Sequence, residues 1–167
     1  MNPGLLLRAI LAAVLVPGTV VGLVPYLIVR PTLVPSSFDI SIVSILAILT
    51  GTAGLALLLA CIWRFGLHGK GTLAPVDPPR TLVVQSLYRY TRNPMYVAVT
   101  IVLLSEAVLC RSVPVLIYTV IALACFHLFV VLYEEPNLKA RFGASYDEYK
   151  NAVPRWGIAR KPYEGGR

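Results

Sequence analysis

Residues 113–133 read VPVLIYTVIALACFHLFVVLY and contain no Lys, Arg, Asp or Glu. As an α-helix rising 1.5 Å per residue, this stretch would extend about 31 Å, enough to cross the hydrocarbon core of a bilayer, which is about 30 Å thick. Three further apolar stretches precede it, at residues 9–29, 40–63 and 95–110. The pattern predicts an all-α, polytopic membrane protein with about four transmembrane helices and a helical C-terminal tail.

The composition of the 167-residue chain agrees with a membrane protein. Hydrophobic residues make up 57% and charged residues 14%, whereas about a quarter of the residues in a typical soluble protein are charged. The mean hydropathy is +0.73. Too few charged side chains are present to cover a water-facing surface, which excludes a nucleic-acid-binding module, a secreted disulfide module and an ordinary cytosolic enzyme.

The three cysteines, Cys61, Cys110 and Cys125, lie within apolar stretches, and no CxxC pair or His/Cys cluster accompanies them. A structural zinc site needs four clustered ligands. We therefore predict reduced, buried, structural cysteines and no metal site.

Most of the positive charge falls in three segments. Thirteen of the 15 Lys and Arg residues lie before the first apolar stretch, between the second and the third, or after the fourth. If each stretch crosses the membrane once, these three segments share one side. Because cytoplasmic loops carry an excess of Lys and Arg, we predict a multi-pass protein with both termini and the long middle loop in the cytoplasm. Membrane lipids, and not nucleic acid, are the expected partners.

Short motifs refine the predicted helices. Arg111 and Ser112 are the only residues between the third and fourth stretches, which predicts a tight helical hairpin. Pro17 and Pro25 should kink the first helix. The small residues at 51–54 (GTAG) should let the second helix pack closely against a neighbour.

The tail after residue 135 has its own helical pattern. Gly143 predicts a helix end, and residues 145–148 (SYDE) predict a capping box at the start of the next helix. Tyr146, Tyr149 and Val153 then form one apolar stripe. The tail is therefore predicted to be ordered.

The predicted hairpin brings two helix ends together. Asn93 is an N-cap residue followed by proline at the first helical position, and the free N–H groups behind it favour an anion, as does Arg92. The fourth stretch returns to the same side and ends in Glu134 and Glu135. A ligand with a carboxylate and a cationic group would suit both ends, and a plain helix start beside two solvated glutamates is the alternative.

Other polar side chains near these ends are ambiguous. His127 lies seven residues before Glu134, about two helical turns, so both fall on one stripe of an α-helix. A histidine within a membrane span is a functional candidate, and an interhelical hydrogen bond is the alternative. Tyr88, Tyr90 and Tyr96 are either aromatic residues of the membrane interface or a wall of a cofactor site.

Seven short motifs follow one another in a fixed order along the second half of the chain. They are Gly69–Thr72 (GKGT), Pro78-Pro79, Leu87-Tyr88, Arg92–Tyr96 (RNPMY), Tyr133–Glu135 (YEE), Phe142-Gly143 followed by Tyr146 and Tyr149, and Val153–Arg155 (VPR). This order resembles the integral-membrane methyltransferases, a family that includes isoprenylcysteine carboxyl methyltransferases and phospholipid N-methyltransferases. The resemblance implies a single membrane domain, residues 1–167, in which residues 1–63 form the first two helices and residues 64–156 the cofactor-binding methyltransferase core.

The resemblance also implies a cofactor and a site. The family uses S-adenosylmethionine, held at the cytoplasmic side by the last two helices and the loop before them. Carried over by motif, the cofactor-binding residues are Arg80, Thr81, Leu82, Val83, Tyr88, Asn93, Pro94, Met95, Tyr96 and Glu134. The candidate catalytic residues are Arg92, His127 and Glu135. The implied reaction is methyl transfer to a lipophilic acceptor that enters from the bilayer.

Two positions bear on the acceptor. The prenylcysteine enzymes have His-Pro where this chain has Asn93-Pro94, and an arginine one turn before the first glutamate, where this chain has Val130. The chain is similar to the phospholipid-type branch at Asn93-Pro94 and at residues 133–136 (YEEP), and the accepting group, carboxylate or amine, is left open. An NADPH-dependent membrane reductase of sterol-reductase type and a non-catalytic four-helix membrane protein are the alternatives.

Overall fold

The computed structural model describes residues 15–32, 41–68, 82 and 84–165. The predicted cofactor residues Arg80, Thr81 and Val83 therefore lie outside the described residues. In chain order the elements are η1 (Thr19–Leu23), α2 (Val24–Val29), η2 (Arg30–Thr32), α3 (Ile42–His68), η3 (Ser86–Arg89), α4 (Pro94–Leu109), α5 (Val113–Phe129), η4 (Val130–Glu134), α6 (Glu135–Phe142) and α7 (Ala144–Ala152). These elements confirm the prediction of an all-helical protein.

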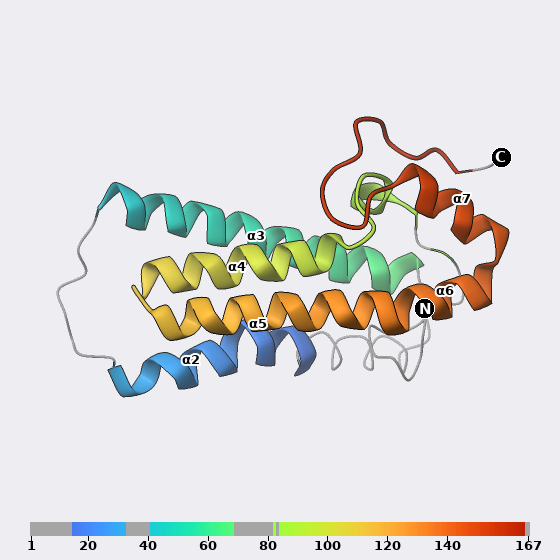
Figure 1. The fold of residues 1–167 in the computed structure, drawn as a ribbon. Coiled ribbons are helices and arrows are strands. Elements are labelled where there is room, and N and C mark those ends of the chain that lie inside the picture. Colours follow the sequence, from blue (N-terminus) through green and yellow to red (C-terminus); the bar gives the residue numbers. More distant parts are fainter. Residues whose placement is uncertain (1–14, 33–40, 69–81, 83, 166–167) are drawn as a thin grey trace.

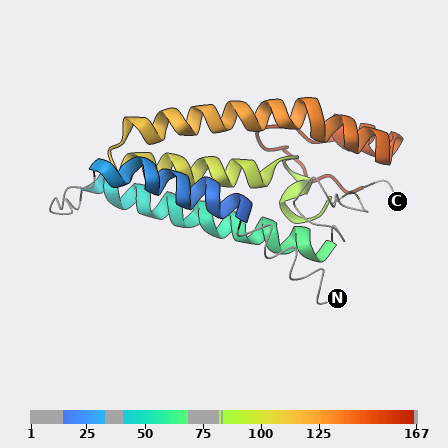
Figure 2. The ribbon, with the colours of Figure 1, turned by 90° about the horizontal axis from the view of Figure 1, so that it is seen from below.

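The apolar helices run side by side along most of the length of the molecule (Figures 1 and 2). α4 packs against α3 on one side and α5 on the other, while α2 contacts α5 and η1 contacts α4. The main core lies between these helices and is formed by Leu58, Ala98, Val99, Leu103 and Ala122. The short elements η3, α6 and α7 gather at the end of the bundle where α4 begins (Figure 1).

Two glycines set the close approach of α3 to α4. A Cβ atom added to Gly51 would lie 3.0 Å from the Cβ of Ser105, and one added to Gly54 would lie 2.8 Å from the Cγ2 of Ile101. Real Cβ atoms essentially never come as close as 2.8 Å to a neighbour, so a side chain at Gly54 would force Ile101 to shift, whereas at Gly51 the contact would be tight. The hydroxyls of Thr50 and Ser105 are 3.1 Å apart across the same contact. The prediction that the small residues at 51–54 permit close helix packing is confirmed.

The two long apolar helices expose many of their hydrophobic side chains, whereas α4 exposes only Leu104 and Val108 among its large ones. Two helical stretches, Ile42–Arg64 and Val113–Phe142, are long and apolar enough to cross a membrane, and only 22% of the residues in the apolar part of each are buried. Two shorter apolar helices, Leu15–Val29 and Pro94–Leu109, pack beside them. An outward-facing apolar surface of this extent suits lipid and not water. Passage of all four helices through the membrane stays a prediction.

The prediction that all three cysteines are buried is wrong for two of them, and the apolar surface explains why. All three are free, as predicted, but only Cys61 is buried, while Cys110 and Cys125 are exposed. The latter two lie on or beside helices whose outer faces are apolar, and a thiol behaves as a small hydrophobic group there.

Prolines are accommodated by wide helical turns. Proline lacks an N–H group, so Pro25 cannot donate to an earlier carbonyl. The N–H of Val24 reaches back five residues to the carbonyl of Thr19, which makes η1 a π-helix. The hydroxyl of Tyr118 in α5 donates to the carbonyl of Val20 at 3.1 Å, so a side chain from another helix serves an oxygen whose α-helical donor, the N–H of Val24, binds Thr19 instead.

A second π-turn, η4, precedes Pro136 in the same way. The N–H of Glu135 donates to the carbonyl of Val130, five residues back. The helix that begins at Val113 continues through this turn to Phe142. The predicted end of the fourth stretch at Tyr133 is therefore only the end of its apolar part, and the helix itself carries the two glutamates in its last third.

The predicted hairpin between α4 and α5 is confirmed. Arg111 turns the chain with a φ of +48°, and Ser112 is the N-cap of α5, its side-chain oxygen accepting from the N–H of Val115 at 3.4 Å. The two helices are thus antiparallel neighbours. Their other ends, where Pro94 begins α4 and α5 runs into η4, lie together at the opposite end of the bundle.

The tail is ordered and helical, as predicted, but its capping differs from the prediction. Gly143, with a φ of +52°, separates α6 from α7, and the buried cluster of Tyr146, Tyr149 and Val153 is present. The capping-box prediction is wrong, because α7 begins at Ala144 and Ser145 lies inside the helix. The N-cap is Gly143 itself, which lacks a side chain to cap with.

Candidate functional site

The start of α4 and the junction of η4 with α6 meet through two pairs of side chains. The hydroxyl of Tyr96 donates to Oε1 of Glu134 at 2.7 Å, and Nη1 of Arg92 donates to Oε1 of Glu135 at 2.8 Å. The prediction that these two helix ends are neighbours is confirmed. Adjacent glutamates on one helix therefore have different partners: a phenol for Glu134 and a guanidinium for Glu135.

Glu135 is held by several cations. Arg155 binds both of its oxygens, with Nε 2.6 Å from Oε1 and Nη2 2.9 Å from Oε2, and Nζ of Lys150 is 3.9 Å from Oε2. Only 8% of Glu135 is exposed. A bidentate Arg–carboxylate pair fixes both groups in one orientation. Glu135 thus joins α6, the start of α4 and the C-terminal tail. We call this group of four side chains the Glu135 clamp (Arg92, Glu135, Lys150, Arg155).

Arg92 is nearly as enclosed as its partner. Its side chain is 10% exposed, and Nη1 also lies 3.3 Å from the hydroxyl of Tyr146. Its Nε atom is buried without a hydrogen-bond partner among the described residues. A buried donor without a partner is costly, which marks this position as one where a water or a ligand atom would be bound.

Asn93 occupies the predicted N-cap position of α4, but its side chain does not cap the helix. Its amide Nδ2 donates instead to the carbonyl of Arg155 at 3.2 Å. The backbone N–H of Arg92 donates to the carbonyl of Pro154 at 3.0 Å. Tail residues 154 and 155 therefore run directly along the start of α4. Pro94 is buried and begins the helix, and Met95 packs against the main core.

Aromatic rings surround the Tyr96–Glu134 pair. The ring centroid of Tyr96 lies 4.8 Å from that of Phe126 and 6.4 Å from that of Trp156. The indole Nε1 of Trp156 donates to Nδ1 of His127 at 3.0 Å. His127 is exposed on the outer face of α5, where the tail tryptophan contacts it. The π-turn η4 lies between His127 and Glu134 and changes the α-helical register on which the predicted common stripe depended.

Leu82 and Tyr88 contact the tail. Leu82 packs against the cluster of Tyr146, Tyr149 and Val153. The hydroxyl of Tyr149 donates to the carbonyl of Tyr88 at 2.6 Å. Burial raises the pKa of both phenols above the ordinary value, so Tyr149 stays protonated and keeps donating at physiological pH.

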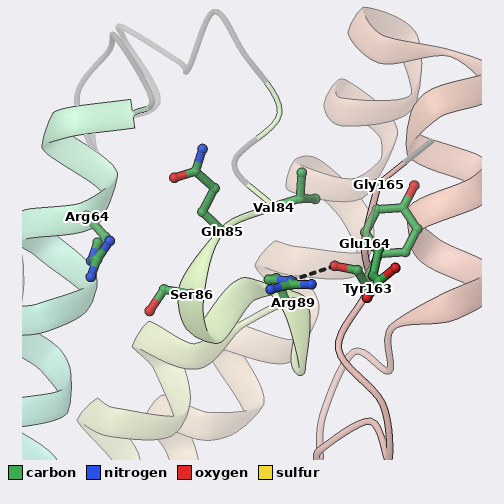
Figure 3. A pocket seen from close by; sticks show the side chains of 8 residues that line it. All are labelled: Arg64, Val84, Gln85, Ser86, Arg89, Tyr163, Glu164 and Gly165. Atoms are coloured by element: carbon green, nitrogen blue, oxygen red, sulfur yellow. Dashed lines mark hydrogen bonds between the residues drawn. The ribbon is translucent and has the colours of Figure 1, made fainter. Parts of the chain in front are cut away.

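Two cavities adjoin segment 84–93. The smaller, of about 30 Å³, has room for one water. Its lining residues are Arg92, Asn93, Val130, Glu134, Glu135, Leu138, Tyr146 and Tyr149. The larger cavity is open and measures about 620 Å³ (Figure 3). It is lined by Arg64 at the end of α3, by Val84, Gln85, Ser86 and Arg89 at η3, and by Tyr163, Glu164 and Gly165 of the tail.

The larger cavity has a charged and fixed wall. Nε of Arg89 donates to the carbonyl of Tyr163 at 2.7 Å, and the N–H of Tyr163 donates to the carbonyl of Arg89 at 2.9 Å, so tail and η3 are tied together. Ser86 has a φ of +55°, a conformation that is uncommon outside glycine and that is found often at functional sites. The sequence prediction did not include this cavity, because its walls come from three distant segments.

The tail residues of the site were also missed. Arg155 and Trp156 touch Asn93, Tyr96, His127 and Glu135, yet only the VPR motif drew attention to this segment, and it carried no assigned role. The signal was present in the charge pattern: two adjacent glutamates near the apolar part of a helix need cations, and Arg155 is one of several in the tail.

Fold and site together define a membrane-embedded helical protein with a charged, aromatic site where the helices leave the apolar zone. A family model described as phospholipid methyltransferase matches residues 42–145, well over half of the chain, and the chain belongs to this family. The resemblance seen in its motifs is thereby confirmed, and the protein is an integral membrane protein of a methyltransferase family. No curated protein and no solved structure gives a significant match.

Proposed function

We propose that this protein transfers a methyl group from S-adenosylmethionine to a lipophilic acceptor at the cytoplasmic face of the membrane. The observation that carries the proposal is the Tyr96–Glu134 pair, 2.7 Å apart, at the border between apolar helices and a polar end. A family whose members methylate phospholipids needs a polar cofactor and an apolar acceptor to meet at such a border. The family membership favours this function over the reductase alternative.

The size of the cavities indicates where the cofactor would bind. Pockets for small molecules usually measure about 300–1,000 Å³. The cavity of about 30 Å³ beside Glu134 is too small, whereas the open cavity of about 620 Å³ is of the right size. Arg64 and Arg89 would pair with the carboxylate of the cofactor's amino-acid end, and Glu164 with its ammonium group. Bound S-adenosylmethionine supplies a methyl group that its sulfonium already activates.

Segment 84–93 would connect the two parts of the site. Residues 84–86 and 89 line the open cavity, and residues 92 and 93 line the small one. Glu134 would face the reacting groups, because Tyr96 is its only hydrogen-bond partner among the described residues and binds only Oε1. Its Oε2 atom is then available to orient a cationic group or to accept a proton from the acceptor.

The residues of the Glu135 clamp take a different role from the one predicted. Arg92 and Glu135 bind each other and the tail, so we assign them to positioning: they hold Asn93 and Tyr96 at the start of α4 in register with Glu134. His127 and Trp156 form the outer wall on the α5 side, which faces the bilayer and would meet the acceptor. The functional role of His127 stays a prediction.

Ligand-dependent stabilisation of the purified protein tests this proposal. A ligand that binds only the folded state raises the melting temperature. We expect S-adenosylmethionine to do so in detergent or nanodiscs, and Arg89→Ala to weaken the effect. Glu148→Gln, at an exposed position on α7, is the control. Stabilisation by NADPH and not by S-adenosylmethionine would establish the reductase alternative, and stabilisation by neither would favour the non-catalytic one.

A further inference from the structure

One segment outside the apolar helices exposes a large hydrophobic side chain. Nearly all exposed large hydrophobic residues of the described chain lie on the apolar helices or η4, and the two exceptions are Tyr90 and Ile158. Ile158 is 80% exposed, the highest value among them. The N–H of Ala159 donates to the carbonyl of Tyr90 at 2.7 Å, so the segments that carry the two exceptions lie next to each other. Contact with an apolar environment would stabilise an isoleucine side chain that is this exposed on a loop next to membrane helices.

The loop that carries Ile158 lies alongside the bundle. After α7 the chain turns back toward the middle of the helices before it runs out to the C-terminus (Figure 1). Trp156 at the start of this loop donates to His127, an exposed residue of α5, and packs edge-on against Tyr96 in the first turn of α4. These contacts place the loop at the level of the apolar helices. Gly157 follows with a φ of +97°, a backbone conformation that residues other than glycine rarely adopt.

Charges follow the apolar residue. Arg160 and Lys161 are both exposed and come directly after Ala159, and the nearest acidic residue of the loop is Glu164, also exposed. Segments that lie in a membrane interface show this pattern: a tryptophan at the border of the hydrocarbon, an aliphatic side chain beside it, and basic residues next to both. Anionic headgroups attract such basic residues.

We propose that residues 156–161, which we call the tail loop, dock on the anionic surface of the bilayer that surrounds the helices. Ile158 inserts among the acyl chains, Trp156 lies at the headgroup level, and Arg160 and Lys161 bind lipid phosphates. This inference depends on membrane embedding and not on methyl transfer. It has a consequence for the site, because Arg155, directly before the loop, is the bidentate partner of Glu135, so docking would restrain the Glu135 clamp.

Tryptophan quenching tests the insertion of residue 158. The chain has two tryptophans, Trp63 and Trp156, so Ile158→Trp in a Trp63→Phe, Trp156→Phe background reports on one position. The full-length protein is placed in nanodiscs that contain anionic lipid with brominated acyl chains. We expect strong quenching at residue 158. Glu164→Trp in the same background is the matched control and should be quenched much less. Equal quenching of the two reporters would overturn the proposal.

Hydrogen exchange on the unaltered loop provides a test that needs no reporter. Protection of the amides of residues 158, 160 and 161 should be higher in anionic than in zwitterionic nanodiscs. Each basic residue near an anionic surface contributes about fivefold, so Arg160→Ser with Lys161→Ser should lower that protection by about thirtyfold in anionic nanodiscs and have little effect in zwitterionic ones. Protection that does not depend on lipid charge would contradict lipid docking, whether or not the protein proves to be a methyltransferase.

Discussion

Removal of the Arg155 side chain should release the C-terminal tail from the helix bundle. Arg155 donates two short hydrogen bonds to Glu135, at 2.6 and 2.9 Å, and the Glu135 side chain is 10% exposed. Removing one partner of a buried ion pair costs about 3–5 kcal/mol. The Arg155 side chain is 29% exposed, and Arg92 still pairs with Glu135 in the variant. We therefore expect Arg155→Ala to cost about 2–3 kcal/mol, roughly 30- to 150-fold in the ratio of docked to released tail.

Hydrogen exchange measures this ratio directly. The N–H of Arg92 donates to Pro154, and the N–H of Tyr163 donates to Arg89, so both amides are protected only while the tail is docked. Arg155→Ala should lower their protection by the expected factor. Arg155→Lys keeps the charge but loses the planar fork that binds both oxygens. Amide protection in this variant should therefore lie between that of Arg155→Ala and that of the unaltered protein.

A second ion pair of the tail serves as the control. Lys139 and Asp147 are 3.3 Å apart, but their side chains are 63% and 44% exposed. Exposed pairs contribute little, so Lys139→Ala should change the same protection by less than about fivefold. If Arg155→Ala lowers protection no more than Lys139→Ala does, the Glu135 clamp does not hold the tail, and the positioning role assigned to it is wrong.

Three further predictions concern the helices and the topology. Gly54→Ala places a Cβ 2.8 Å from Ile101 and should destabilise the protein by about 1–3 kcal/mol. Gly18→Ala, with nothing within 4 Å, should not. Equal melting temperatures of the two variants would contradict the close packing of α3 and α4. Tyr118→Phe removes the bond to the Val20 carbonyl and should cost about 1 kcal/mol in chemical unfolding; no loss would mean that Val20 finds another donor. A C-terminal green fluorescent protein fusion should fluoresce and a C-terminal alkaline phosphatase fusion should be inactive, because the basic tail is predicted to be cytoplasmic; the reverse result would invert the topology.

The sequence was sufficient for features that depend on neighbouring residues. The hairpin follows from Arg111 and Ser112, which leave too little chain for anything but a tight turn. Close packing at Gly51 and Gly54 follows from the absence of side chains there. The meeting of Arg92 and Tyr96 with Glu134 and Glu135 follows in turn from the hairpin, since antiparallel helices return to the same end.

Features that depend on distant segments were not predictable in this way. The Arg155–Glu135 pair and the Trp156–His127 contact join residues 20 and 29 positions apart through a tail whose path is set by the packing of Tyr146 and Tyr149. The register of His127 was misjudged because Pro136 introduces a π-turn, and an ideal α-helix does not allow for it. The open cavity was missed because α3, η3 and the tail form its walls jointly.

Methyl transfer in nanodiscs tests the central claim most directly. The purified protein is given S-adenosylmethionine labelled in its transferable methyl group together with a lipid extract, and the label in the lipid fraction is measured. The account predicts labelled lipid with the unaltered protein and with Glu148→Gln, and a loss of about tenfold or more with Glu134→Gln, because the proposed site has Glu134 facing the reacting groups. Absence of labelled lipid with folded, unaltered protein, or full activity of Glu134→Gln, would contradict it.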